Sequence, residues 1–224
     1  MGTYAAVVLA GGAARRMGGL DKPALPVGGR PMRDRVLAAV ADATPRVLVG
    51  AADAVPAGVR VVREDPPGGG PVAAAAAGLA LLDTDVTLVA LLAADLPLLT
   101  RAAIGDLLHH LDRETPDTGS AGGPTDPAPP ARDGLGGGEQ PDGACFVDGD
   151  GRRQSLCGVW RVAALRAAVD RLAVERGGSL SGAPVRALLA GLVVSEVAWS
   201  GEGPPPWFDC DTDEDVRRAE EWAR

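Results

Sequence analysis

The chain has 224 residues, of which 46% are hydrophobic; this is enough to bury the core of one α/β domain, so we expect a single domain over residues 1–224. Its formal net charge of −8 argues against the broad basic surface that grips nucleic acid, and favours a small anionic ligand held at one local site. No apolar run has the length of a membrane span and no basic segment precedes the first apolar run, so neither a membrane nor a signal peptide is expected.

The first half of the chain alternates short apolar runs with helical patterns. The predicted elements, in chain order, are a strand at 4–10, a helix from Pro31, strands at 46–49 and 59–62, a helix at 71–82, a strand at 86–92 and a helix capped by Thr100. Such alternation predicts a mainly parallel sheet with helices on both faces.

Residues 115–143 interrupt this pattern, because they are rich in Gly, Pro, Asp and Thr and almost without apolar side chains. A stretch of this kind buries too little surface to offset the entropy of ordering it. We expect a disordered surface insertion, and an interdomain linker is the alternative.

The second half begins with the pattern of a β-hairpin. The predicted elements are strands at 144–147 and 152–156 around a turn at 148–151, helices near 165–172 and 184–189, a strand at 193–197, and a last helix after Thr212. Asp215 stands where a capping box would place it at the start of that last helix.

The segment 9–23 carries the strongest chemical signal, and it has neither the GxGxxG spacing of a dinucleotide site nor the GxxxxGK[ST] of a P-loop. Gly11 and Gly12 leave the first strand without a Cβ, so their backbone amides can approach an anion closely. Arg16 and Lys22 add two cations, and Lys22 is the only lysine of the chain. These features predict a triphosphate site; the alternative is an ordinary glycine-rich turn with incidental charges.

This segment resembles the signature LAGGxxxRMGxDK of the molybdenum cofactor guanylyltransferases and their nucleotidyltransferase relatives. The matching residues are Leu9, Ala10, Gly11, Gly12, Arg16, Met17, Gly18, Asp21 and Lys22, followed by Pro26, Gly29, Arg30 and Pro31. The resemblance implies a three-layer α/β/α Rossmann-like nucleotidyltransferase fold, with a mainly parallel sheet and an antiparallel hairpin.

Shorter matches follow along the chain. They are Asp65 before Gly70-Pro71, the D-x-P motif Asp95-Leu96-Pro97, the segment 154–160, and the acidic segment 209–212. The chain departs from the family pattern at Gly50, Ser155 and Asp213. The resemblance implies that Arg16, Lys22 and Asp95 are catalytic, and that the nucleotide contacts Leu9, Ala10, Gly11, Gly12, Lys22, Asp65 and Asp95.

A magnesium site is expected at Asp95, which follows the buried strand 86–92. Ligands of open α/β sheets bind at the carboxyl ends of strands, and Mg²⁺ prefers one or two carboxylates together with phosphate oxygens and water. Asp95 could instead begin a turn or cap the next helix. Asp211, which shares one side of an extended segment with Asp209, could complete the metal shell, although both could equally form an acidic helix entry.

The resemblance implies transfer of GMP from GTP to the phosphate of molybdopterin, with Mg²⁺ as cofactor and pyrophosphate as the second product. GTP and molybdopterin are then the expected small-molecule partners, alongside proteins of molybdoenzyme maturation. Another NTP or another phosphorylated acceptor stays open, as does a non-catalytic GTP-binding module. The cysteines Cys145, Cys157 and Cys210 are odd in number and lack CxxC spacing, which favours reduced thiols in the cytoplasm.

Overall fold

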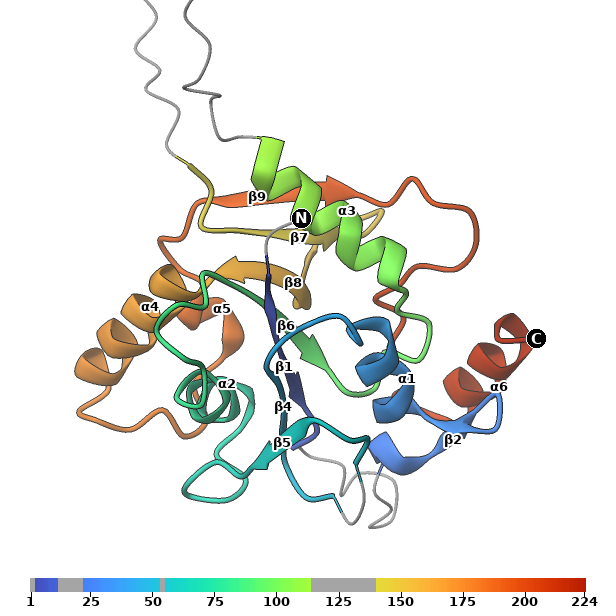
Figure 1. Ribbon diagram of the computed structural model, residues 1–224, viewed down its shortest axis with the longest axis horizontal. Coiled ribbons are helices and arrows are strands. Elements are labelled where there is room, and N and C mark those ends of the chain that lie inside the picture. Colours follow the sequence, from blue (N-terminus) through green and yellow to red (C-terminus); the bar gives the residue numbers. More distant parts are fainter. Residues whose placement is uncertain (1–2, 12–21, 53–54, 114–139) are drawn as a thin grey trace, which may run out of the picture.

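The computed structural model describes residues 3–11, 22–52, 55–113 and 140–224. Its centre is a seven-stranded sheet in the order β5-β4-β1-β6-β8-β7-β9 (Figure 1). The strands are β1 (Ala5–Leu9), β4 (Arg46–Val49), β5 (Val59–Val62), β6 (Leu88–Ala93), β7 (Gly143–Val147), β8 (Arg153–Arg161) and β9 (Val194–Ala198). Within this sheet β8 is antiparallel to both of its neighbours, and the other pairs are parallel.

Helices cover both faces of the sheet. The described helices are α1 (Met32–Ala39), α2 (Pro71–Leu79), α3 (Arg101–Arg113), α4 (Val162–Glu175), α5 (Val185–Leu188) and α6 (Asp213–Trp222), of which α6 contacts a small second sheet. Helices α1 and α3 contact one face, whereas α2, α4 and α5 lie together on the other (Figure 1). The predicted α/β/α layering, with a mainly parallel sheet and an antiparallel hairpin, is therefore confirmed.

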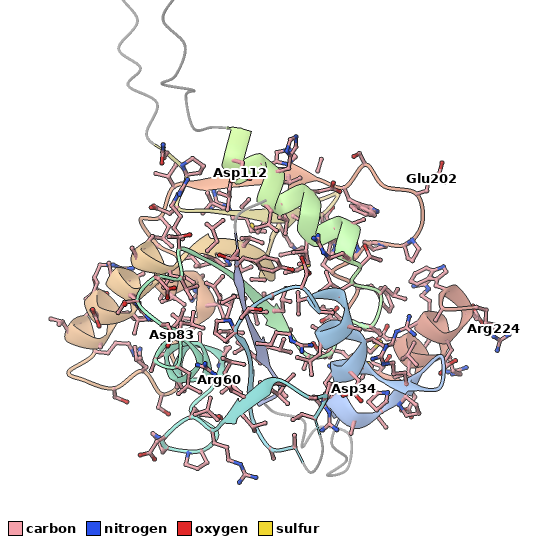
Figure 2. All side chains as sticks on the ribbon, viewed as in Figure 1. Asp34, Arg60, Asp83, Asp112, Glu202 and Arg224 are labelled. Atoms are coloured by element: carbon pink, nitrogen blue, oxygen red, sulfur yellow. The ribbon has the colours of Figure 1, made fainter. Side chains whose placement is uncertain are left out.

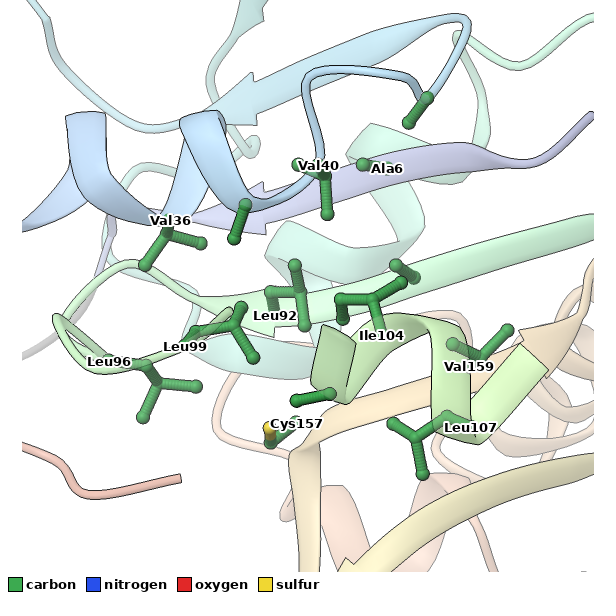
Figure 3. Packing of buried hydrophobic residues seen from close by; sticks show 14 of the residues in the cluster. Ala6, Val36, Val40, Leu92, Leu96, Leu99, Ile104, Leu107, Cys157 and Val159 are labelled. Atoms are coloured by element: carbon green, nitrogen blue, oxygen red, sulfur yellow. The ribbon is translucent and has the colours of Figure 1, made fainter. Parts of the chain in front are cut away.

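The alternation of side chains along β1 divides the core into two halves. Ala6 and Val8 pack in the half below α1 and α3, while Val7 and Leu9 pack in the half below α2 and α4. Both faces of β1 are thus buried, which explains why its sequence is an uninterrupted apolar run. Figure 3 shows the first half, where Val36, Ile104 and Leu107 meet the side chains of the sheet.

A small two-stranded sheet lies next to α6. It consists of β2 (Pro26–Val27) and β3 (Arg30–Pro31), and it follows a single 3₁₀ turn, η2 (Lys22–Ala24). Val27 packs with Met32, Leu98 and Ala219 in a third apolar cluster. This cluster fixes the segment that leads out of the glycine-rich loop against the C-terminal helix.

The predicted strands 46–49 and 59–62 are confirmed at both ends. The helix predicted over 71–82 ends earlier, at Leu79, and the strand predicted as 152–156 extends to Arg161. The extension is possible because β8 lies between β6 and β7 and bonds to both along its length. Because the extension depends on pairing with strands distant in the sequence, the local sequence pattern does not predict it.

Residues 115–139 of the predicted insertion lie outside the described ranges. Its last residues, 140–143, are described, and the predicted boundary at 143 is wrong because Gly143 is the first residue of β7. The Asp142 amide donates to the Val193 carbonyl at 2.7 Å, so the backbone here already belongs to the sheet. The glycine is required because the Trp160 ring fills the space that a Cβ would need.

Charged side chains project outward around the sheet, as Arg60, Asp83 and Glu202 illustrate (Figure 2). Within the described ranges, no helix combines the length and the apolar character that crossing a membrane requires.

Candidate active site

Lys22 forms ion pairs with two aspartates that are far from it in sequence. Its Nζ lies 2.7 Å from Asp95 Oδ2 and 2.7 Å from Asp211 Oδ1. Lys22 begins the η2 turn, Asp95 follows β6, and Asp211 precedes α6. The structure thus brings together three residues that the sequence selected from three separate motifs.

The Lys22 side chain is 11% exposed, whereas those of Asp95 and Asp211 are 25% and 75% exposed. Burial alone would lower the pKa of the Lys22 ammonium. The hydrogen bonds that the ammonium donates to Asp211 and Asp95, together with the charges of these carboxylates, outweigh that effect and raise the pKa above its ordinary value. Lys22 is therefore a firmly charged ammonium group at the carboxyl edge of the sheet.

A capping box fixes the backbone that presents Asp211. The Asp215 carboxylate accepts hydrogen bonds from the amides of Asp211 at 3.1 Å and Thr212 at 2.8 Å. Thr212 in turn accepts from the Asp215 amide, so the predicted capping box at the start of α6 is confirmed. On the other side, the Cys210 amide donates to the Asp95 carbonyl at 3.3 Å, which joins this segment to the end of β6.

Asp209 belongs to the same acidic segment, and its side chain is open to solvent. Partial desolvation of the carboxylate by neighbouring atoms, together with repulsion from Asp211 and Asp95, nevertheless raises the pKa of the Asp209 carboxyl. No ion pair joins Asp209 to Lys22 among the described residues. The two aspartates therefore differ: Asp211 contacts the ammonium and Asp209 lines the adjoining cavity.

Leu9, Ala10 and Gly11 lead out of β1 into the glycine-rich loop. The Ala10 amide donates to Val49 at 2.8 Å, and Leu9 accepts from the Ala94 amide at 3.0 Å, so β4 and β6 hold both sides of this exit. Gly50 packs directly against it, because a Cβ on Gly50 would lie 2.9 Å from the Ala10 carbonyl carbon. Its φ of 141° also favours glycine. The presence of glycine at position 50, where the chain departs from the family pattern, is thus explained by this close approach to the Ala10 backbone.

Of two neighbouring acidic residues after β5, the structure turns Glu64 inward and leaves Asp65 exposed. Glu64 is 6% exposed, its carboxylate packs against Gly11, and it accepts a hydrogen bond from the Gly68 amide at 3.0 Å. Sequence reasoning selected Asp65 through the resemblance and missed Glu64. The exposed position of Asp65 gives it no contact in the described site, so its nucleotide role stays a prediction.

A cavity of about 320 Å³ opens at this edge of the sheet. Its lining comes from the ends of three neighbouring strands and two adjoining segments: Leu9, Gly11, Pro71, Ala93, Asp95, Leu96, Gln154, Leu156, Cys157, Trp207 and Asp209. Because β8 is antiparallel to β6, its first half runs alongside and past the carboxyl end of β6, with Cys157 paired to Leu92, and β6 in turn pairs with the end of β1. Gly11 and Asp95 therefore face one cavity, as expected from the topology.

Gly12, Arg16 and Asp21 lie outside the described ranges, so their predicted roles stay predictions. In the part of the chain that is described, no group of three or more His, Cys, Asp and Glu side chains could hold a metal ion by itself. The two carboxylates that meet at Lys22 are nevertheless the oxygen donors that Mg²⁺ prefers, and its remaining ligands are commonly phosphate oxygens and water. The donor set thus fits a metal ion that arrives with a nucleotide.

Many solved structures share this fold, including the following two. One is 2-C-methyl-D-erythritol 4-phosphate cytidylyltransferase from Thermus thermophilus, with 20% identity, a TM-score of 0.62 and coverage of 99% of each chain. Another is molybdopterin-guanine dinucleotide biosynthesis protein A from Archaeoglobus fulgidus, with 17% identity, a TM-score of 0.63 and coverage of 96% of each chain. At such identities the likeness establishes the fold alone.

No curated protein matches the chain by sequence. The profile of the MobA-like NTP transferase domain, however, matches residues 6–190, which include β1, Lys22 and Asp95. The chain therefore belongs to the MobA-like NTP transferase domain family, and nucleotidyl transfer is its class of reaction.

Proposed function

We propose that the protein transfers GMP from GTP to the phosphate of molybdopterin and releases pyrophosphate, with Mg²⁺ as cofactor. The observation that carries this proposal is the meeting of Lys22, Asp95 and Asp211 beside a cavity that Gly11 also lines. A magnesium-bound triphosphate requires a cation and accessible backbone amides to bind its phosphates, and carboxylates to bind the metal ion.

In the proposed reaction, an oxygen of the acceptor phosphate forms a bond to the α-phosphorus of GTP. The bond from that phosphorus to the oxygen that bridges to the β-phosphate breaks, and pyrophosphate leaves with the electron pair. Because the nucleophile is already an anion, the protein needs no strong general base. Its contribution is to position the two substrates and to stabilise negative charge.

The described residues divide this work. Gly11 leaves room for the phosphates at the exit of β1, and the Lys22 ammonium would neutralise charge that develops on pyrophosphate. Arg16 and the amide of Gly12 would assist from the loop. Asp95 and Asp211 would hold Mg²⁺, which when bound supplies Lewis-acid neutralisation of the α-phosphate.

The guanine preference and the molybdopterin acceptor rest on the resemblance of the Leu9–Lys22 segment to guanylyltransferases. Proteins of molybdoenzyme maturation are the proposed protein partners. We propose the cytoplasm as the location, and the buried free thiols Cys145, Cys157 and Cys210 support a reducing compartment.

The test is to incubate the purified protein with Mg²⁺, one NTP and one acceptor, and to measure pyrophosphate. The acceptors are molybdopterin and 2-C-methyl-D-erythritol 4-phosphate, the latter because a protein of the same fold is named for it. Pyrophosphate from GTP and molybdopterin alone supports the proposal. Turnover of CTP with methylerythritol phosphate would instead identify the protein as a cytidylyltransferase of that acceptor. Tight GTP binding without any turnover would favour a non-catalytic GTP-binding module.

A further inference from the structure

Aromatic side chains are scarce in this chain, which contains four Trp, two Phe and one Tyr. Three of them nevertheless form one cluster, of which Trp207 reaches the candidate active site. Phe146 packs against Trp207 with ring centroids 5.3 Å apart, and edge-on against Trp199 at 5.6 Å. Trp207 is the one aromatic side chain among the described residues that line the cavity.

The cavity has two chemically different halves on either side of Asp95. The half over β1 is formed by Leu9, Gly11 and Pro71, at the exit of the glycine-rich loop. The half over β8 is formed by Gln154, Leu156, Cys157 and Trp207, and it carries no charged side chain apart from Asp209 at its border. Because β6 lies between β1 and β8 in the sheet, Asp95 stands between these halves.

Trp207 is held in place from both sides along the backbone. The Phe208 amide donates to the Pro205 carbonyl at 3.1 Å and closes a turn over Pro206 and Trp207, at the end of three consecutive prolines. The Cys210 amide donates to the Asp95 carbonyl at 3.3 Å. Beneath the ring, Phe146 is fully buried and gives it a rigid support. An indole fixed in this way binds a flat ligand at little cost in side-chain entropy.

Gln154 supplies a polar group to the same half. Its side-chain amide nitrogen donates to Asp148 Oδ2 at 3.1 Å, which orients the amide at the start of β8. A carboxamide carries a donor and an acceptor and can pair with the edge of a heterocycle. A polyol phosphate would instead require several hydrogen-bonding partners in place of Leu156, Cys157 and the indole face.

We infer that the β8 half of the cavity binds the acceptor through its flat, fused heterocycle, which stacks on Trp207, and that Trp207 determines the acceptor specificity of this enzyme. This inference deepens the proposed function, on which it rests, by assigning the half of the cavity and the side chain that distinguish a pterin acceptor from a polyol phosphate. Stacking of a base on an aromatic side chain commonly changes affinity by roughly tenfold or more when the aromatic ring is removed.

The test compares three variants with the wild type. Trp207→Phe retains a flat ring, Trp207→Leu retains only apolar volume, and Trp222→Leu is the matched control. Trp222 lies in α6, is 43% exposed and packs against Phe208, and it is not among the residues that line the cavity. The probe is 6-hydroxymethylpterin, a fluorescent pterin without a phosphate, added to protein saturated with Mg²⁺ and GTP; KM for molybdopterin and for GTP is measured in parallel.

We expect Trp207→Leu to weaken pterin binding and to raise the KM for molybdopterin by about tenfold or more, with the KM for GTP unchanged. Trp207→Phe and Trp222→Leu should stay close to the wild type. Equal pterin affinity in Trp207→Leu and wild type would overturn the inference, as would a parallel rise in the KM for GTP. Trp207-dependent pterin binding without turnover of any acceptor would overturn the proposed function while supporting this inference.

Discussion

Lys22 Nζ lies 2.7 Å from Asp95 Oδ2, although the two residues are 73 positions apart in the sequence. Asp211 binds the same ammonium, so one lysine pairs with two carboxylates and leaves one negative charge at the point where a divalent cation would be held. A metal ion and an ammonium group cannot occupy one position between the same oxygens. We therefore expect Lys22 to turn toward the nucleotide phosphates when magnesium and nucleotide bind.

Lys22→Ala should have two opposite effects. Without the ammonium, Asp95 and Asp211 attract free Mg²⁺ more strongly, so metal affinity in the absence of nucleotide should rise. Turnover should nevertheless fall by roughly a hundredfold or more, because a charged contact to the leaving pyrophosphate is lost. Calorimetry with Mg²⁺ and pyrophosphate release measure the two effects separately.

Lys22→Arg serves as the control, since it keeps the charge and should leave metal affinity near that of the wild type. Asp95→Ala should lose both metal affinity and turnover, with the far-UV circular dichroism of a folded chain. Near-normal turnover in Lys22→Ala and Asp95→Ala would remove both residues from the site.

Asp211 and Asp209 provide a paired test of the acidic segment. Asp211→Asn removes an ion pair with Lys22, whereas Asp209→Asn leaves that ion pair in place. We expect Asp211→Asn to raise the Mg²⁺ concentration needed for half-maximal turnover, and Asp209→Asn to change it much less. Titrations of Mg²⁺ at saturating GTP measure this difference, and equal shifts in both variants would contradict the assignment of Asp211.

The sequence was sufficient to predict the layers and most strands of this fold. Strands β4 and β5 are short apolar segments bounded by turns, so local pattern and tertiary pairing agree. The hairpin β7–β8 was also predicted, but its length was not, because β8 extends wherever β6 supplies a partner. The composition places Gly143 in the insertion, because a high glycine content is typical of disordered segments. In the structure Gly143 belongs to β7, where the absence of a Cβ leaves room for the Trp160 ring.

The candidate site was predictable as a meeting of strand ends, since Lys22, Asp95 and the acidic segment all follow such ends or adjoin them. Which acidic side chain turns inward was not predictable. Successive residues of an extended segment point to opposite sides, so one shift in register exchanges Glu64 and Asp65. Asp211, not Asp209, contacts Lys22 because the capping box of α6 fixes the backbone around it.

The three cysteines should behave as buried thiols. Cys145, Cys157 and Cys210 are at most 1% exposed, and burial raises the pKa of each, to about 11 for Cys145 and about 12 for Cys210. Iodoacetamide should therefore react slowly with the native protein and rapidly after unfolding in urea. Fast labelling of the native protein would show that these packing positions are wrong.

The same thiols should make stability depend on alkaline pH. Because their folded pKa values lie above the ordinary value of 9.0, their contribution is fully present below pH 9.0 and is lost as pH rises through the folded values. The urea midpoint should therefore fall from about pH 9 to about pH 12. A variant with all three cysteines changed to Ala should show a smaller fall of the urea midpoint over the same pH range. The part of the fall that persists is expected from Tyr4, because burial and Asp42 raise the pKa of the Tyr4 hydroxyl as well.

Gly50→Ala should disturb the exit of β1 in a way that Gly58→Ala does not. Both glycines have positive φ, 141° and 78°, so both variants should lose about 1–3 kcal/mol of unfolding free energy from backbone strain. A Cβ on Gly50 would also meet the Ala10 backbone at 2.9 Å, whereas the nearest atom to a Cβ on Gly58 is the end of the Arg46 side chain at 3.5 Å. Gly50→Ala must therefore move the segment that leads into the glycine-rich loop. We expect a larger drop in the urea midpoint and weaker GTP binding for Gly50→Ala alone; equal GTP affinity in the two variants would show that the nucleotide does not depend on the geometry of this exit.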